Sequence, residues 1–291
     1  MTRCFLMLCL LTGFAGPARA AVSVKDAAGQ TVALAQPARR IVSLAPHTTE
    51  MLYAVGAGKQ LVGTVDYSNT PPAAKSLPRV GGYSGVSLEA ILRLKPDLVV
   101  AWQDGGNPRE LARLRDMGVA VYISHPLRLE DVASEMRQLG ELAGSSRAKS
   151  AADAYLGRLA GLRQRYAARP PVSVFYQVSS APIFTVSDKS FMGPMITLCG
   201  GRNVFAALPL PAPQVSMEAV VAAQPQVMLV SHRDMLAMWD RWNVIPAVAK
   251  GARYALDADV VSIPGPRLVD GAATVCRTLD TARRQLGLTL D

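Results

Sequence analysis

Seven aromatic or ionisable side chains stand at places where predicted strands or helices give way to loops. They are His47, Tyr67, Tyr83, Trp102, Phe184, Asp259 and Arg267. Aromatic rings supply large, stiff contact area, and polar tips fix the orientation of a bound molecule. Because aromatic residues make up only 6% of the chain, their collection at loops is informative. We predict that these residues line a small-molecule site, with one or two of the rings packing against the core instead.

Patterns that would make such a site catalytic are absent from the sequence. Gly81-Gly-Tyr-Ser-Gly85 has its serine one place away from that of a G-x-S-x-G nucleophile elbow, and neither a dinucleotide fingerprint nor a phosphate loop occurs. The three histidines, His47, His125 and His232, lack the spacing of metal ligands. We therefore predict a binding protein without enzyme activity, cofactor or metal site.

A sixteen-residue phrase occurs twice, at 86–101 and at 215–230. In each copy a serine is placed to cap a short helix, a proline ends that helix, and an apolar run follows as a buried strand. Glu89 and Glu218 fall two residues after the serines, so they miss the capping-box position and are free to point to solvent. The repeat predicts two lobes of like construction, each with one exposed carboxylate at an equivalent place.

Strand and helix patterns alternate in both halves of the chain, which indicates an α/β fold with parallel sheets covered by helices. A helical pattern with one apolar stripe runs from Arg147 to Arg169 between the halves and would reach about 35 Å. We predict two Rossmann-like lobes joined by one long, rigid helix. The N-terminal lobe is predicted over 21–143, the connecting helix over 144–170 and the C-terminal lobe over 171–291.

Local patterns predict the segments around the candidate site. A strand at 40–44 precedes a loop at 45–49 and a helix that begins at Glu50. The segment 179–182 is predicted as a loop, and helices are predicted over 235–248 and 266–286. Because open α/β sheets bind ligands beyond the carboxyl ends of their strands, the loops at those ends are the expected site.

The first twenty residues have the pattern of a secretory signal peptide. A short basic start precedes an apolar run, and Ala18-Arg-Ala20 is a cleavage signal. We predict a soluble, monomeric protein that is exported to the periplasm. The net charge of +9 comes from dispersed arginines without the basic stripe and stacking aromatics of nucleic-acid binding, so no nucleic-acid partner is expected.

Cys199 and Cys276 are the two cysteines outside this leader. An even pair in an exported chain favours a disulfide, which would close a loop of about 78 residues. Two free, buried thiols are the alternative. Neither cysteine has metal-ligand spacing around it.

Nearly the whole chain after the leader resembles the helical-backbone periplasmic binding proteins of ABC importers, and most closely their cobalamin-binding members. The resemblance rests on Ile41-Val-Ser-Leu-Ala-Pro-His-Thr-Thr-Glu50, Tyr67-Ser-Asn-Thr-Pro-Pro72, Ser87-Leu-Glu89, Lys95-Pro-Asp-Leu-Val-Val-Ala-Trp102 and Cys199-Gly-Gly201. It implies two lobes joined by one long helix, a ligand such as cobalamin held in the cleft between them, and release of that ligand to a membrane permease.

The resemblance also implies roles for single residues. Ligand contacts carry over to Tyr67, Tyr83, Trp102 and Phe184, a cleft position carries over to His47, and Asp259 and Arg267 match with a different spacing. Glu89 and Glu218 are implied to dock to arginines of a permease dimer. The disulfide carries over to Cys199 and Cys276.

The sequence departs from the cobalamin-binding members at two aromatic positions. Ala212 stands where they have one tryptophan, and Tyr83 stands where they have another. The loss of a large ring predicts weaker affinity or room for a bulkier corrinoid. His47 is predicted either to approach the cobalt or to hydrogen-bond a ligand amide.

Other members of the family bind ferric siderophores or haem, and these are the alternative ligands. An anionic ferric siderophore would require several arginines in the cleft, for which Arg267, Arg79 and Arg233 are available. Haem would require an axial tyrosine or histidine, for which His47, Tyr67 and Tyr83 are the candidates.

Overall fold

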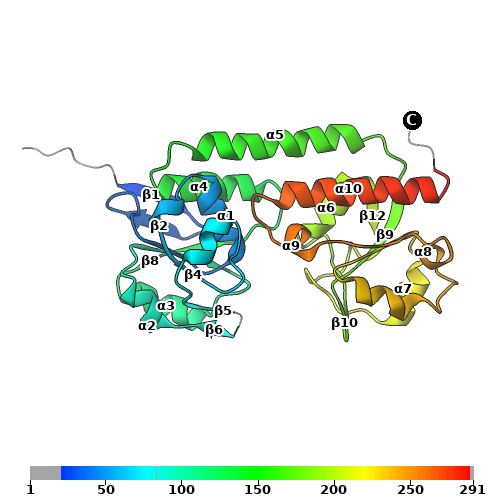
Figure 1. Ribbon diagram of the computed structural model, residues 1–291, viewed down its shortest axis with the longest axis horizontal. Helices are drawn as coiled ribbons and strands as arrows, with labels where there is room; N and C mark the ends of the chain where they lie inside the picture. The colour runs from blue at the N-terminus through cyan, green and yellow to red at the C-terminus, as the bar shows by residue number, and fades with distance from the viewer. Residues whose placement is uncertain (1–20, 83, 289–291) are drawn as a thin grey trace, which may run out of the picture.

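The computed structural model describes residues 21–82 and 84–288, and it has two lobes, each built on a four-stranded parallel sheet (Figure 1). Helices cover these sheets, so the predicted α/β class is confirmed. The predicted signal peptide at 1–20 and the candidate ligand residue Tyr83 lie outside the described residues.

The sheet of the N-terminal lobe has the strand order β4-β3-β7-β8. The elements of this lobe are β1 (Val22–Lys25), β2 (Thr31–Leu34), β3 (Ile41–Ser43), α1 (Pro46–Ala54), η1 (Gly58–Gln60), β4 (Leu61–Thr64), η2 (Pro72–Ser76), β5 (Gly81–Gly82), β6 (Gly85–Val86), α2 (Leu88–Arg93), β7 (Leu98–Trp102), α3 (Pro108–Asp116), β8 (Ala120–Ser124) and α4 (Asp131–Leu142). Along β7, Leu98 and Val100 enter one apolar cluster, while Val99 and Ala101 enter another. This strand is therefore buried on both faces, as a central parallel strand must be.

The sheet of the C-terminal lobe has the order β12-β9-β13-β14, again with all neighbours parallel. Its elements are β9 (Val172–Gln177), β10 (Ser179–Ser180), β11 (Ile183–Phe184), α6 (Met192–Leu198), β12 (Gly201–Asn203), α7 (Met217–Ala223), β13 (Val227–Val230), η3 (Arg233–Trp239), α8 (Pro246–Ala249), β14 (Arg253–Ala255), α9 (Ala258–Val261) and α10 (Leu268–Gln285). Each sheet therefore has two buried central strands between two edge strands, and all neighbouring strands are parallel.

The repeated phrase forms the same local structure in both lobes. Ser87 caps α2 and Ser216 caps α7, each accepting a hydrogen bond of 3.1 Å from the amide three residues later. Lys95 and Gln224, at equivalent positions, have left-handed backbones with φ of 47° and 46°. Each precedes a proline, which disfavours the right-handed helical conformation in the residue before it. The two helices therefore begin and end by the same physical means.

One long helix, α5 (Ala148–Tyr166), runs above α4 of the N-terminal lobe and α10 of the C-terminal lobe (Figure 1). Its 19 residues correspond to about 28 Å, so it is shorter than the predicted segment but joins the lobes as expected. Arg163 of α5 pairs with Glu130 beside α4, and Arg158 pairs with Asp270 of α10. The helix is thus tied to both lobes.

Several local predictions are wrong for identifiable reasons. Helix α1 begins at Pro46, because proline suits the first helical position, so the predicted loop at 45–49 is largely helical. The helix predicted over 235–248 is a 3-10 helix that ends at Trp239, and an α-helix begins again only at Pro246, because Ile245 before this proline has an extended backbone. The predicted loop at 179–182 belongs to a small antiparallel hairpin, β10–β11.

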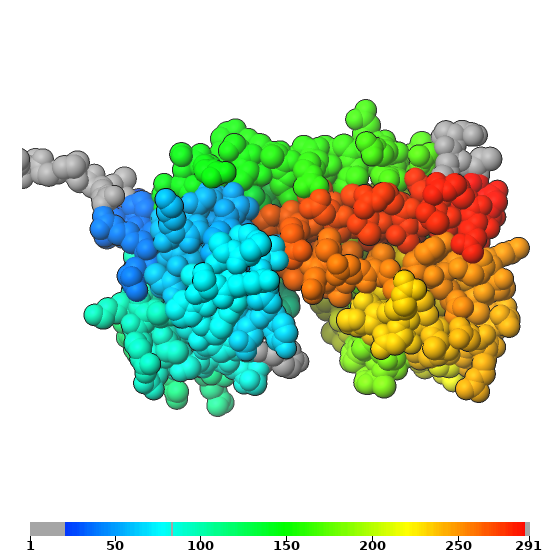
Figure 2. Space-filling model, viewed as in Figure 1, coloured from blue at the N-terminus to red at the C-terminus, as the bar shows by residue number. Residues whose placement is uncertain are grey.

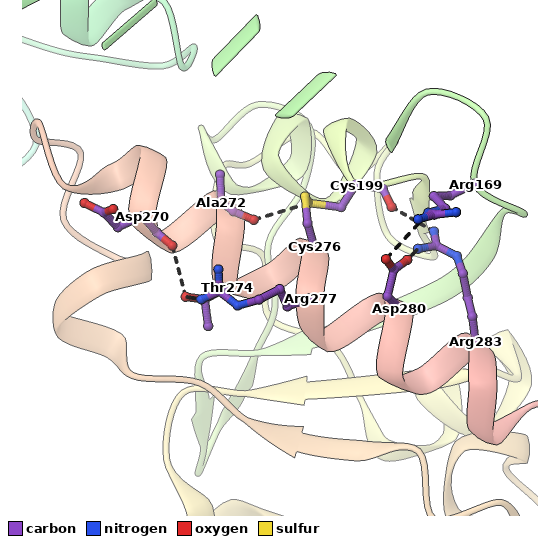
Figure 3. Close-up of a disulfide and its surroundings, with 9 residues drawn as sticks. All are labelled: Arg169, Cys199, Asp270, Ala272, Thr274, Cys276, Arg277, Asp280 and Arg283. Carbon is purple, nitrogen blue, oxygen red and sulfur yellow. Dashed lines mark hydrogen bonds and ion pairs between the residues drawn. A yellow bond between two sulfur atoms is a disulfide. The ribbon is translucent and has the colours of Figure 1, made fainter. Parts of the chain in front are cut away.

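Cys199 and Cys276 form a disulfide between the end of α6 and the middle of α10, which confirms that pairing (Figure 3). Next to it the fully buried Arg283 donates hydrogen bonds of 2.7 Å to the carbonyl oxygens of Cys199 and Pro170. Asp280 accepts a third bond from Arg283 at 2.8 Å. Covalent and ionic contacts therefore hold α10 against α6 and the start of β9.

Replacing both cysteines by alanine is expected to lower the free energy of unfolding by about 4–5 kcal/mol, since the disulfide closes a long loop in the unfolded chain. Urea denaturation of the purified variant measures the change, and reduction of the unaltered protein provides an independent comparison. A loss below about 1 kcal/mol in both experiments would contradict the chain-entropy argument.

Candidate functional site

A pocket of about 480 Å³ lies at the carboxyl ends of the strands in the N-terminal lobe. Loops after β3, β4 and β7, the β5–β6 hairpin and the first turn of α3 form its walls. The described lining residues are 44–46, 65–67, 82, 84–86, 102, 104–107, 110 and 111. The space-filling view shows an open notch between the two lobes (Figure 2). This end of a parallel sheet is where α/β proteins bind ligands.

Trp102 forms part of the pocket wall and is the last residue of β7. The ring of His47 meets its indole edge-on, with 5.7 Å between ring centroids. Gly105 passes so close that a Cβ atom there would lie 2.7 Å from the indole ring. The indole is therefore held from two sides and presents a fixed aromatic surface to the pocket.

Tyr67 contributes a second ring to the pocket, from the loop after β4. Its side chain is 80% exposed, the largest exposure among the described large apolar residues. Two of the predicted ligand contacts thus share one pocket, although their contact with a ligand stays a prediction.

Three carboxylates line the same pocket, from Asp66, Asp104 and Glu110, and the described lining contains neither lysine nor arginine. Asp104 lies 3.2 Å from the imidazole of His125, which would offset its charge only when protonated. The pocket consequently favours neutral or cationic ligands over anionic ones.

His47 is buried inside α1, with 2% of its surface exposed, rather than standing in a loop. Its Nε2 lies 2.8 Å from the Ser124 hydroxyl, which donates to the Glu135 carboxylate in a short hydrogen bond. Burial lowers the pKa of His47 to about 3 and raises the pKa of Glu135 to about 7. His47 is therefore a neutral support behind Trp102, and its predicted ligand contact would require the side chain to move.

Arg267, a predicted ligand residue, connects the two lobes. Its Nη2 and Nε atoms donate to the carboxylate of Glu50 at 2.6 and 3.0 Å, and these bonds raise its pKa. Glu50 belongs to α1 of the N-terminal lobe and is only 5% exposed. Nη2 also donates to the backbone oxygen of Asp259, at 3.2 Å. The guanidinium charge is thus balanced before any ligand enters.

The other predicted ligand residues of the C-terminal lobe lie outside this pocket. Asp259 is an exposed residue of α9, and Phe184 is half-buried in β11. Ala212 is exposed in the segment that follows Leu210, whose side chain is 60% exposed. The structure therefore brings together only the N-terminal part of the predicted ligand set.

Glu89 and Glu218 are exposed in the first turns of α2 and α7. Both helices lie in the lower part of their lobes, away from α5 (Figure 1). Glu89 forms a 2.6 Å ion pair with Arg93 one turn later. Hydrogen bonds from the backbone amide of Glu218 and from the Ser216 hydroxyl lower the pKa of the Glu218 carboxyl. The two carboxylates occupy equivalent places but differ in their partners.

Sequence reasoning missed the acidic lining and the interlobe ion pair. Asp66 and Asp104 follow the ends of β4 and β7 by two residues, so the rule for strand ends would have identified them. No local signal marks the pairing of Glu50 with a residue more than 200 positions away.

Within 21–82 and 84–288, no group of three or more His, Cys, Asp or Glu side chains is arranged to hold a metal ion. The same described residues contain no helix that is both long and apolar enough to cross a membrane.

Comparisons with known proteins agree with this architecture. A family model described as "Periplasmic binding protein" matches residues 41–260. The vitamin B12-binding protein of Vibrio cholerae is 40% identical over 253 residues, which cover 86% of this chain and 92% of that protein. The crystal structure of the periplasmic vitamin B12 binding protein BtuF of Vibrio cholerae matches with a TM-score of 0.79 at 40% identity, covering 85% of this chain and 99% of that one. The periplasmic heme-binding protein RhuT from Roseiflexus sp. RS-1 matches with a TM-score of 0.73 at 26% identity, covering 84% and 98%.

His47 and Glu135 are both buried, and they make the stability of the fold depend on pH in opposite directions. Below pH 6.5 His47 is protonated in the unfolded state but stays neutral in the folded state. The contribution of His47 to the free energy of unfolding therefore falls as the pH drops from 6.5 toward 3. The folded state keeps a proton on Glu135 that the unfolded state loses above pH 4.5. That contribution is full below pH 4.5 and is lost as the pH rises through about 7.

We expect Glu135→Gln to remove the second dependence and expose the first. Between pH 4.5 and 6.5 its free energy of unfolding should rise with pH more steeply than that of the unaltered protein, by at most about 1.4 kcal/mol per pH unit. Urea denaturation at several pH values in this range measures both slopes. Parallel curves would show that Glu135 titrates alike in the folded and unfolded states.

Proposed function

The chain belongs to the periplasmic binding protein family, and from this premise we propose that it captures cobalamin between its lobes and delivers it to a membrane ABC permease. The observation that best supports cobalamin as the ligand is that Tyr67 and Trp102 line one pocket, whose described lining has no basic residue. The chain is also 40% identical to a vitamin B12-binding protein. The function is binding and release, without turnover of the ligand.

A corrin ring suits this wall of the cleft for chemical reasons. It is wide and largely apolar on its faces, and amide groups surround its edge. Flat contacts from Tyr67 and Trp102 meet the faces, while Asp66, Asp104 and Glu110 accept hydrogen bonds from amide N–H groups. The pocket in the N-terminal lobe is one side of the site, and the C-terminal lobe supplies the other.

The charges argue against the alternative ligands. A ferric siderophore or the propionates of haem would meet three carboxylates in the pocket. Arg267 is already paired with Glu50, and Arg79 donates to backbone oxygens. His47, a candidate axial ligand for haem, is buried behind Trp102. These observations support cobalamin over a ferric siderophore and over haem held by His47.

Delivery requires a second contact, with the permease. We assign it to Glu89 and Glu218, because the same capped helix presents each of them to solvent in its own lobe. A monomer with two equivalent carboxylates suits a two-fold symmetric permease whose arginines face the binding protein. Docking at α2 must compete with the ion pair between Glu89 and Arg93.

We also propose a cellular location and a division into parts for this protein. The periplasmic relatives support export, with 1–20 as a cleaved signal peptide and a soluble mature protein in the periplasm. Its parts are an N-terminal lobe over 21–143, a connecting segment over 144–170 that contains α5, and a C-terminal lobe over 171–291.

Calorimetric titration with cyanocobalamin tests the ligand. We expect binding, and we expect Trp102→Ala to weaken it at least about tenfold, because a central aromatic contact is lost. Trp102→Phe, which keeps a flat ring, is the matched control and should lose less than about threefold. If the protein does not bind cyanocobalamin at high micromolar concentration, or binds haem more tightly, the cobalamin assignment is wrong, although the family membership is unaffected.

The docking role is tested by reversing both charges. Glu89→Arg with Glu218→Arg should abolish cobalamin uptake in cells that depend on this chain, since attraction to permease arginines becomes repulsion. Affinity for cyanocobalamin should stay within about twofold, because both residues lie outside the pocket. Asp116→Arg with Glu141→Arg reverses two other exposed carboxylates and should leave uptake intact. Loss of uptake in both double variants would remove the assignment.

A further inference from the structure

The turn that carries Tyr67 has an unusual backbone. Tyr67 has a left-handed conformation, with φ of 64°, which side chains other than glycine and asparagine rarely adopt. The residue after it, Ser68, points inward with 1% exposure, while Tyr67 points outward with 80%. The turn therefore presents Tyr67 at the open side of the pocket that it lines, and its left-handed backbone persists only where surrounding contacts enforce it.

The turn contains few contacts of its own, among them a 2.9 Å hydrogen bond from the amide of Asn69 to the oxygen of Tyr67. Its closing hydrogen bond, from the amide of Ser68 to the oxygen of Val65, is 3.3 Å long. The hydroxyl of Ser68 is buried without a hydrogen-bond partner among the described atoms. The left-handed backbone of Tyr67 therefore also depends on contacts from outside the turn.

Arg79 supplies that support from a different segment. Its Nη1 donates to the oxygen of Val65 at 2.9 Å and to the oxygen of Ser68 at 3.1 Å, so one nitrogen bridges both ends of the turn. Its Nη2 donates to the side-chain oxygen of Asn69 at 3.3 Å. Because both Nη1 hydrogens are used, this nitrogen has none left for a ligand.

The backbone of Arg79 is fixed as well. It forms a parallel bridge with Thr64 at the end of β4, flanked by hydrogen bonds of 2.9 Å in both directions. Two residues later the same segment enters β5, whose hairpin forms another wall of the pocket. Arg79 thus joins the turn of Tyr67 to the adjoining hairpin, where the oxygen of Gly81 also accepts a 2.9 Å hydrogen bond from the amide of Asp66.

We propose that Arg79 is a positioning residue for ligand capture, which holds the Tyr67 turn in its left-handed form so that the ring is already at the edge of the pocket before a ligand arrives. The proposal rests on the proposed function of the cleft. Fixing a contact ring in advance removes the entropy loss of ordering it at the moment of binding. Loss of the guanidinium should therefore reduce affinity only through Tyr67.

A double-mutant cycle tests this dependence. By calorimetry with cyanocobalamin, Arg79→Gln should weaken binding about five- to twentyfold, and Arg79→Lys, which retains a donor, should weaken it less. In a Tyr67→Ala background, adding Arg79→Gln should change affinity by less than about twofold. Arg113→Gln, which removes an exposed guanidinium from α3, is the control and should have no effect. An equal loss in both backgrounds would overturn the proposal.

A measurement without ligand separates this proposal from the proposed function. Hydrogen exchange at the amides of Ser68 and Asn69, both hydrogen-bonded in the turn, should accelerate at least about tenfold in Arg79→Gln, while β3 and β7 keep their protection. Unchanged exchange would overturn the clamp, and faster exchange with unaltered affinity would overturn its role in capture. If the unaltered protein binds no cyanocobalamin, the proposed function fails, and exchange still decides whether Arg79 holds the turn.

Discussion

The bidentate ion pair between Glu50 and Arg267 is the contact on which the arrangement of the two lobes depends. It joins the first helix of one lobe to the start of the last helix of the other, and Glu50 is almost fully buried. Removing one partner would leave a buried charge uncompensated, which is strongly destabilising. The ion pairs from α5 to each lobe add further contacts that tie the lobes in this arrangement.

The same ion pair decides the chemistry of the cleft. Because Glu50 neutralises Arg267, the cleft wall gains no free positive charge from it, and the carboxylates of Asp66, Asp104 and Glu110 dominate the pocket. This lining favours a neutral or cationic ligand over an anionic one. His47 is a neutral support for Trp102.

Features encoded within a few residues could be predicted from the sequence. The capped helices of the repeat, the connecting helix and the alternation of strands all follow from local periodicity, serine, proline and glycine. The partners of Glu50 and His47 could not be predicted, because they come from segments far away in the chain. The left-handed backbone of Tyr67 is likewise imposed by a tertiary contact, from Arg79. The residues of the site were therefore more accessible to prediction than the interactions that hold them.

A crystal structure of the protein with cyanocobalamin tests the central claim most directly. The account predicts a corrin ring between the lobes in contact with Tyr67 and Trp102, with the ion pair between Glu50 and Arg267 preserved. It also predicts no direct contact between Arg79 and the ligand. A corrinoid bound elsewhere, or an Arg267 released from Glu50 to bind the ligand, would contradict the account.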